Sequence, residues 1–74
     1  MTPDRILAIL HSLGRGDLET VRARLAEARQ GCLDLGRPEL AALLEEAAAA
    51  LQGGDIRTWR RRVETAIARL GHLR

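Results

Sequence analysis

The stretch Gly53-Gly54-Asp55-Ile56-Arg57-Thr58-Trp59 decides the fold of this 74-residue chain. A similar stretch, Gly16-Asp17-Leu18-Glu19-Thr20-Val21, lies upstream at an offset of 38 residues. In both, glycine supplies the backbone freedom of a turn, and aspartate is a preferred residue for capping a helix N-terminus. Each stretch therefore predicts a turn followed by the start of a helix.

The same apolar spacing follows both stretches. Residues at intervals of three and four lie along one side of a helix, and such a seam packs against a neighbouring helix. The first seam is Leu18, Val21, Leu25, Ala28, Cys32 and Leu35, and the second is Ile56, Trp59, Val63, Ala66, Leu70 and Leu73. Because the offset is constant, the sequence predicts an internal repeat with one such helix in each copy.

Two further helices are predicted from their boundary residues. Thr2 is a suitable cap and Pro3 fits a first helical position, while Gly36 ends one helix and Pro38 begins the next. Gly31 costs about 1 kcal/mol within a helix. We expect the second helix to continue past it, the alternative being a looser last turn over 31–34. The predicted helices are 3–13, 17–35, 38–51 and 55–72.

Composition supports an all-α fold in a single domain, residues 1–74. Leu and Ala dominate, Trp59 is the only aromatic residue, and strands draw on β-branched and aromatic residues. We expect a small four-helix up-down bundle built from two helical hairpins. One cysteine and two histidines provide neither an intrachain disulfide nor a four-ligand zinc site, so no metal or cofactor is expected.

Paired helices in which Gly-Asp opens the second helix of each pair resemble tetratricopeptide-type arrays. Small or aliphatic residues of that second helix correspond here to Val21, Leu25 and Ala28, and to Trp59, Val63 and Ala66. The repeat offset is longer than in that family, and the Trp-Leu-Gly-Tyr pattern of its first helix is absent. The resemblance therefore implies helix-hairpin construction and assigns no family.

The chain carries no motif typical of catalysis. It has no serine elbow, no phosphate-binding loop and no HExxH pattern. Glu45 and Glu46 are adjacent carboxylates, but neighbouring residues of a helix diverge by about 100°. We expect a protein that is not an enzyme. Cys32 and Trp59 are expected in the core, the alternatives being a reactive thiol and an exposed stacking platform, and His11 and His72 at the surface.

Arginines gather in the last predicted helix. They are Arg57, Arg60, Arg61 and Arg62, and residues 55–74 carry a net charge of +4 where residues 38–51 carry −3. A basic helix can bind phosphates, which makes these arginines candidate nucleic-acid contacts. The alternative is that they are solvated, or pair with Glu64 in the case of Arg60 and with Glu45 and Glu46 of the third helix.

Unequal helix lengths predict self-association. At 1.5 Å per residue the second helix spans about 27 Å and the first only about 16 Å. The first helix is then too short to cover the whole seam, which leaves Cys32 and its neighbours without cover within one chain. The wide Leu/Ala arc of the third helix is a second candidate contact. The predicted self-association surface comprises Leu33, Leu35, Leu43, Ala47 and Ala50, and the predicted assembly is a symmetric homodimer.

Two functions follow as expectations. The first is a non-enzymatic module that associates with itself or binds another protein. The alternative is a nucleic-acid-associated protein that binds phosphates through its arginine-rich fourth helix. No apolar run approaches the roughly 20 residues needed to cross a bilayer, so we expect a cytoplasmic protein without a membrane partner.

Overall fold

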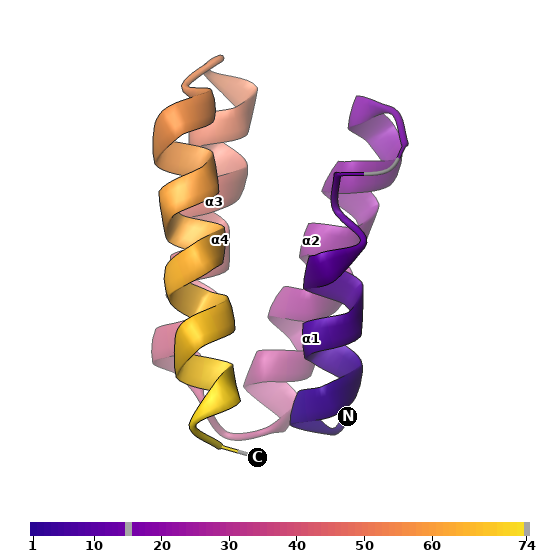
Figure 1. Cartoon of the computed structure of the whole chain (residues 1–74), viewed down its shortest axis with the longest axis vertical. Coiled ribbons are helices and arrows are strands. Elements are labelled where there is room, and N and C mark those ends of the chain that lie inside the picture. Colours follow the sequence, from indigo (N-terminus) through magenta and orange to yellow (C-terminus); the bar gives the residue numbers. More distant parts are fainter. Residues whose placement is uncertain (15, 74) are drawn as a thin grey trace.

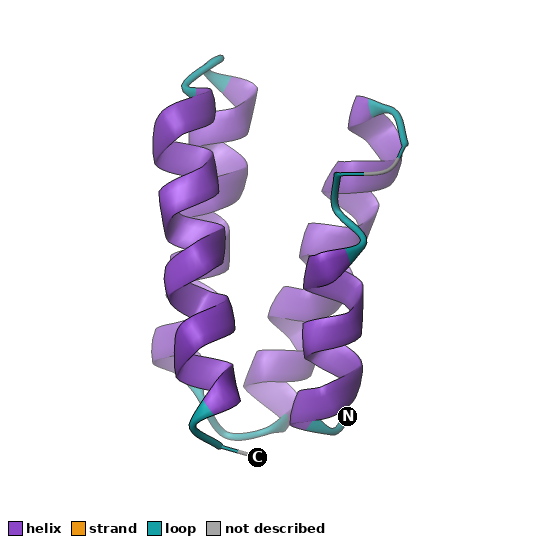
Figure 2. Cartoon of the chain, viewed as in Figure 1, coloured by secondary structure: helices purple, strands orange, loops and turns teal. Residues whose placement is uncertain are grey.

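The fold is all-α, as predicted. The computed structural model describes residues 1–14 and 16–73, and no strand occurs among them. The helices are α1 (Pro3–His11), α2 (Leu18–Asp34), α3 (Pro38–Gln52) and α4 (Ile56–Gly71) (Figure 2). All four predicted helices are present, with ends shifted by one or two residues.

The helices form an up-down bundle of two hairpins, α1 with α2 and α3 with α4 (Figure 1). Each helix packs against the next one along the chain, and α4 packs against α1. The N- and C-terminal ends lie at the same end of the bundle (Figure 1). The molecule measures 31 × 20 × 17 Å, which suits short antiparallel helices around one core.

Side-chain caps begin three of the helices, as the sequence predicts. The Asp17 carboxylate accepts a hydrogen bond from the Thr20 backbone N–H at 2.8 Å, and the Asp55 carboxylate accepts one from the Thr58 N–H at 3.1 Å. Thr2 caps α1 in the same way. The two Gly-Asp stretches therefore cap their helices in the same way, although the backbone differs before the helix, with φ +126° at Gly16 and +81° at Gly54.

Two glycines close the turns after α2 and α3. Gly36 has φ +79° and Gly54 has φ +81°, a conformation that glycine adopts without a steric cost. The N–H of the residue after each glycine donates to a carbonyl near the end of the preceding helix, that of Cys32 at 2.9 Å and that of Ala50 at 2.8 Å. These bonds satisfy carbonyls that the helix ends leave free.

Helix α2 runs through Gly31 without a break. A Cβ at this position would lie 3.1 Å from Ile6 Cγ1 and 2.5 Å from Met1 Sδ. The glycine therefore lets the start of α1 approach the last turns of α2 closely. The conformational cost of a helical glycine is offset here by close packing between the two helices.

The core contains most of both seams but not their first residues. Leu18 and Ile56 are 54% and 46% exposed, so the prediction that they are buried is wrong. Each stands in the first turn of its helix, at the end of the bundle that α1 is too short to reach. The core residues are Ile6, Leu7, Ile9, Leu10, Leu13, Val21, Leu25, Ala28, Cys32, Leu40, Ala41, Leu44, Ala47, Val63, Ala66 and Leu70.

Trp59 is half-buried and packs against this core, in agreement with its predicted role as an anchor. Its indole Nε1 is buried and has no hydrogen-bond partner among the described residues. The ring therefore contributes through apolar contact. Such a side chain is poorly placed to act as an exposed platform for stacking bases.

Candidate interaction surfaces

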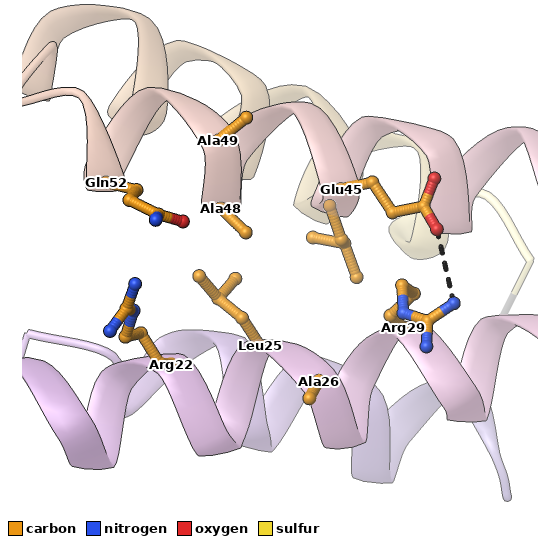
Figure 3. Close-up of a pocket in the computed structure, with 9 residues that line it drawn as sticks. Arg22, Leu25, Ala26, Arg29, Glu45, Ala48, Ala49 and Gln52 are labelled. Atoms are coloured by element: carbon orange, nitrogen blue, oxygen red, sulfur yellow. Dashed lines mark hydrogen bonds and ion pairs between the residues drawn. The ribbon is translucent and has the colours of Figure 1, made fainter.

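A groove of about 350 Å³ runs between α2 and α3 (Figure 3). Its floor is apolar, because Leu25 and Leu44 are only 2% and 1% exposed and Ala48 lies beside them. Its rims are polar. The full lining is Arg22, Leu25, Ala26, Arg29, Leu44, Glu45, Ala48, Ala49 and Gln52.

Helical spacing places these side chains along the groove. Arg22, Leu25 and Arg29 follow one another at intervals of three and four, which puts them on one side of α2. At one end of the groove, Arg29 Nη1 lies 3.2 Å from Glu45 Oε1 (Figure 3). Toward the other end, Arg22 faces Gln52 across the opening (Figure 3). The α2 rim is thus basic, and the α3 rim combines a carboxylate with an amide.

Two exposed leucines extend the same side of α2. Leu18 stands four residues before Arg22, and Leu33 stands four residues after Arg29. Leu18 is 54% exposed and Leu33 is 41% exposed. An apolar groove with a large exposed leucine beyond each end is the composition expected of an interaction surface.

The residues of the predicted self-association surface lie in different environments in the structure. Ala47 is fully buried in the core of its own chain, so its inclusion in an exposed surface is wrong. Leu43 and Ala50 are half-buried, and their spacing from Glu46, which pairs with Arg62, puts them on the side of α3 toward α4. Leu35 is half-buried against the core, and Leu33 alone is exposed. The arc of α3 is wide because α2 and α4 both pack against it.

Cys32 is fully covered within the chain, contrary to the expectation that it lacks cover. The hairpin is antiparallel, so α1 begins beside the last turns of α2, where Met1 and Ile6 meet Gly31. The short α1 therefore leaves the first turn of α2 uncovered and not the last. Burial raises the pKa of the Cys32 thiol, and the nearby charge of Glu39 raises it further. Cys32 is thus a buried thiol, as predicted.

The arginines of α4 are in different environments. Arg62 Nε lies 3.2 Å from Glu46 Oε2, but its N–H makes no hydrogen bond, so this contact is purely electrostatic. The predicted pairing with α3 therefore occurs at Arg62. The expected pair between Arg60 and Glu64 does not form within the described residues. Glu45 pairs with α2 and not with α4.

Arg57, Arg60 and Arg61 are exposed. At 3.6 residues per turn, their three positions span an arc of about 100° on the exposed side of α4. Arg61 is near enough to Asp55 to contribute to the lowered pKa of that carboxyl, after the larger effect of hydrogen bonds from Thr58. These three arginines thus form a basic patch on the first turns of α4.

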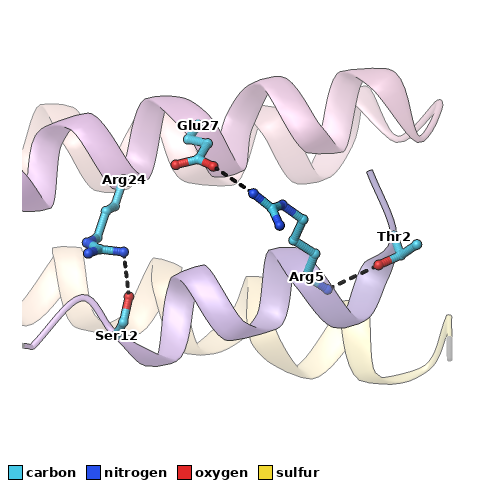
Figure 4. A network of polar contacts seen from close by, with 5 residues as sticks. All are labelled: Thr2, Arg5, Ser12, Arg24 and Glu27. Carbon is cyan, nitrogen blue, oxygen red and sulfur yellow. Dashed lines mark hydrogen bonds and ion pairs between the residues drawn. The ribbon is translucent and has the colours of Figure 1, made fainter.

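Polar contacts also join α1 to α2 (Figure 4). Arg24 Nη1 donates to Ser12 Oγ at 3.3 Å, and Arg5 Nη2 lies 3.9 Å from Glu27 Oε1. These side chains are exposed or half-buried. The contacts position α1 on α2 and bring together no set of groups suited to catalysis.

Within residues 1–14 and 16–73, no three histidine, cysteine, aspartate or glutamate side chains gather as potential metal ligands. No helix in that part of the chain has the length and apolar character required to span a membrane. No protein-family model, curated protein or solved structure matches the chain. The resemblance to tetratricopeptide-type arrays therefore concerns hairpin construction alone.

Proposed function

We propose that this protein is a non-enzymatic, cytoplasmic self-association module that works as a homodimer. The observation that carries this proposal is the α2–α3 groove, with its apolar floor and the exposed Leu18 and Leu33 in line with it. Its polar side chains are two arginines, a glutamate and a glutamine. That set lacks a nucleophile paired with a base, which favours binding over chemistry.

The size of the chain supports the same proposal. In a chain of fewer than about 80 residues, the hydrophobic core rarely supplies more than roughly 3–5 kcal/mol of net stability. The single cysteine of this chain is free, so no disulfide adds to that stability. Association stabilises the folded state by mass action. A bundle of this kind therefore gains stability when a second copy covers its exposed leucines.

Sedimentation equilibrium over a range of micromolar concentrations tests this function. We expect a mass of twice 8.1 kDa and a melting temperature that rises with protein concentration. Leu18→Gln combined with Leu33→Gln shifts the equilibrium toward monomer. Ile56→Gln is the matched control, because Ile56 is equally exposed but stands on α4, outside the groove. A single-chain mass at every concentration contradicts the proposal.

A second candidate function rests on the basic patch of Arg57, Arg60 and Arg61, to which no carboxylate is ion-paired within the described residues. These side chains are free to contact the phosphates of a nucleic acid. A gel-shift series at increasing salt tests this candidate. Replacing all three by glutamine is expected to lower the salt slope by about 1 for each phosphate that is no longer bound. No shift at low ionic strength removes the candidate.

A further inference from the structure

We infer that a second copy of the chain sits on the α2–α3 groove, with its α2 against the α3 of the first copy and the two-fold axis parallel to the helices. This inference rests on the proposed self-association and adds the face and the orientation. A two-fold axis presents the same surface on both copies, so the face must be complementary to itself. The charges of the two rims meet this condition.

The rims carry opposite character. Arg22 and Arg29 stand on α2, while Glu45 and Gln52 stand on α3. A two-fold axis parallel to the helices places each α2 opposite the partner's α3 and keeps residues at the same height along the groove. Arg29 then meets the partner's Glu45, and Arg22 meets the partner's Gln52. Together with the 3.2 Å pair inside each chain, this gives a ring of four alternating charges.

The alternative orientation is disfavoured by charge. A two-fold axis perpendicular to the helices places α2 on the partner's α2 and α3 on the partner's α3. Because this axis reverses the direction along the groove, Arg22 of one copy then faces Arg29 of the other, and Glu45 faces the partner's Gln52 instead of an arginine. Like charges brought together in an interface disfavour that arrangement. The charge pattern of the groove therefore selects the orientation that pairs α2 with α3.

The groove face is also large enough for a stable dimer interface. A standard interface buries about 800 Å² on each partner. The chain exposes 4621 Å², so such an interface uses about a sixth of its surface, the share of one long side of the bundle. Ala26 and Ala49 are exposed on opposite rims and their side chains are small, so the backbones of two copies can approach there. Leu18 and Leu33 extend the contact beyond the groove.

Disulfide trapping tests the orientation. In a Cys32→Ala background, one protein carries Ala26→Cys and a second carries Ala49→Cys, and the two are mixed in a thiol–disulfide redox buffer. The proposed arrangement brings residue 26 of one copy to residue 49 of the other. Mixed disulfides are then expected in excess, by on the order of a hundredfold, over a control pair in which Ala23→Cys replaces Ala26→Cys. Ala23 is exposed on α2 but does not line the groove.

The outcomes separate the orientation from the function. Mixed 26–49 disulfides that exceed the control support the arrangement. A predominance of 26–26 disulfides indicates α2 packed on α2 and overturns it. A dimer in sedimentation whose mixed disulfides do not exceed the control overturns the face but leaves self-association standing. A monomer in sedimentation overturns both. Circular dichroism of each variant verifies that the helical fold is retained.

Discussion

Arg29 of α2 and Glu45 of α3 form an ion pair across the groove, with Nη1 and Oε1 3.2 Å apart. The two side chains are 37% and 61% exposed. A pair this open to solvent contributes only about 0–1 kcal/mol to the stability of one chain. Its larger effect is expected between chains, where a second copy excludes water from the same charges.

Charge reversal at these two positions is expected to separate self-association from folding. In a dimer of Arg29→Glu chains, glutamates at positions 29 and 45 face each other across the interface. In a dimer of Glu45→Arg chains, arginines face each other at the same two positions. Each variant alone is therefore expected to be mostly monomeric, whereas an equimolar mixture forms a heterodimer. Sedimentation of the three samples measures this. A mixture that dissociates as readily as each variant alone rules out the pairing of Arg29 with the partner's Glu45.

Glycines in two helices are expected to respond differently to alanine. Gly71 has open space around it, so Gly71→Ala stabilises the fold by up to about 1 kcal/mol. Gly31→Ala gains the same helix propensity but pushes against Ile6 and Met1, and overpacking typically costs about 1–3 kcal/mol. Urea unfolding of the two variants compares them. Equal stabilisation by both shows that α1 does not approach Gly31 closely.

The two aspartate caps are expected to make stability depend on acid pH. Hydrogen bonds from Thr20 lower the pKa of Asp17, and those from Thr58 lower the pKa of Asp55, both from an ordinary value of 3.8. Because the folded-state pKa values are depressed, the stabilisation is fully present well above pH 3.8. It is lost as the pH falls through the lower folded values.

Melting temperatures recorded from pH 7 downward measure this loss. Asn caps a helix about as well as Asp but carries no titrating charge. The double variant Asp17→Asn, Asp55→Asn is therefore expected to melt like the parent at pH 7 and to lose less stability below pH 4. An unchanged acid profile in that variant indicates that other carboxyl groups are responsible.

The Cys32 thiol is expected to resist modification in the native protein. It is fully buried, and burial raises its pKa, so little thiolate forms at neutral pH. Ellman's reagent is expected to react at a rate set by unfolding, which denaturant increases. Ala23→Cys in a Cys32→Ala background supplies an exposed thiol for comparison. Equally fast reaction at both positions contradicts the packing of α1 over the end of α2.

Local sequence signals predict the helices correctly. They do not predict which apolar residues are buried, because burial depends on how the helices pack against one another. Asp17 and Asp55 cap their helices as predicted. The capping hydrogen bond joins a carboxylate to the N–H three residues later, so it depends only on the local chain. The prediction that Ala47 lies on an exposed surface is wrong, because periodicity marks an apolar arc but does not say which neighbouring helices cover it. The exposure of Leu18 depends on which end of α2 the short α1 reaches, a property of the antiparallel hairpin and not of spacing.

The candidate surface was only partly predictable for the same reason. Leu33 was expected at an interface, and it is exposed. The pairing of α3 with α4 through Glu46 and Arg62 follows from charge and order along the chain. The groove itself arises from small residues at 48 and 49 opposite two long arginine side chains. Alanine in a helix signals close approach or an open space equally well, and only the packed structure distinguishes them.

Isotope-filtered NMR on a mixture of ¹³C-labelled and unlabelled chains tests the central claim most directly. This experiment detects contacts between copies and no contacts within one copy. We expect contacts between the Ala26 methyl of one copy and the Ala49 methyl of the other, strengthening with protein concentration. A spectrum without contacts between copies, from a sample that tumbles as a single chain, would contradict self-association through the α2–α3 groove.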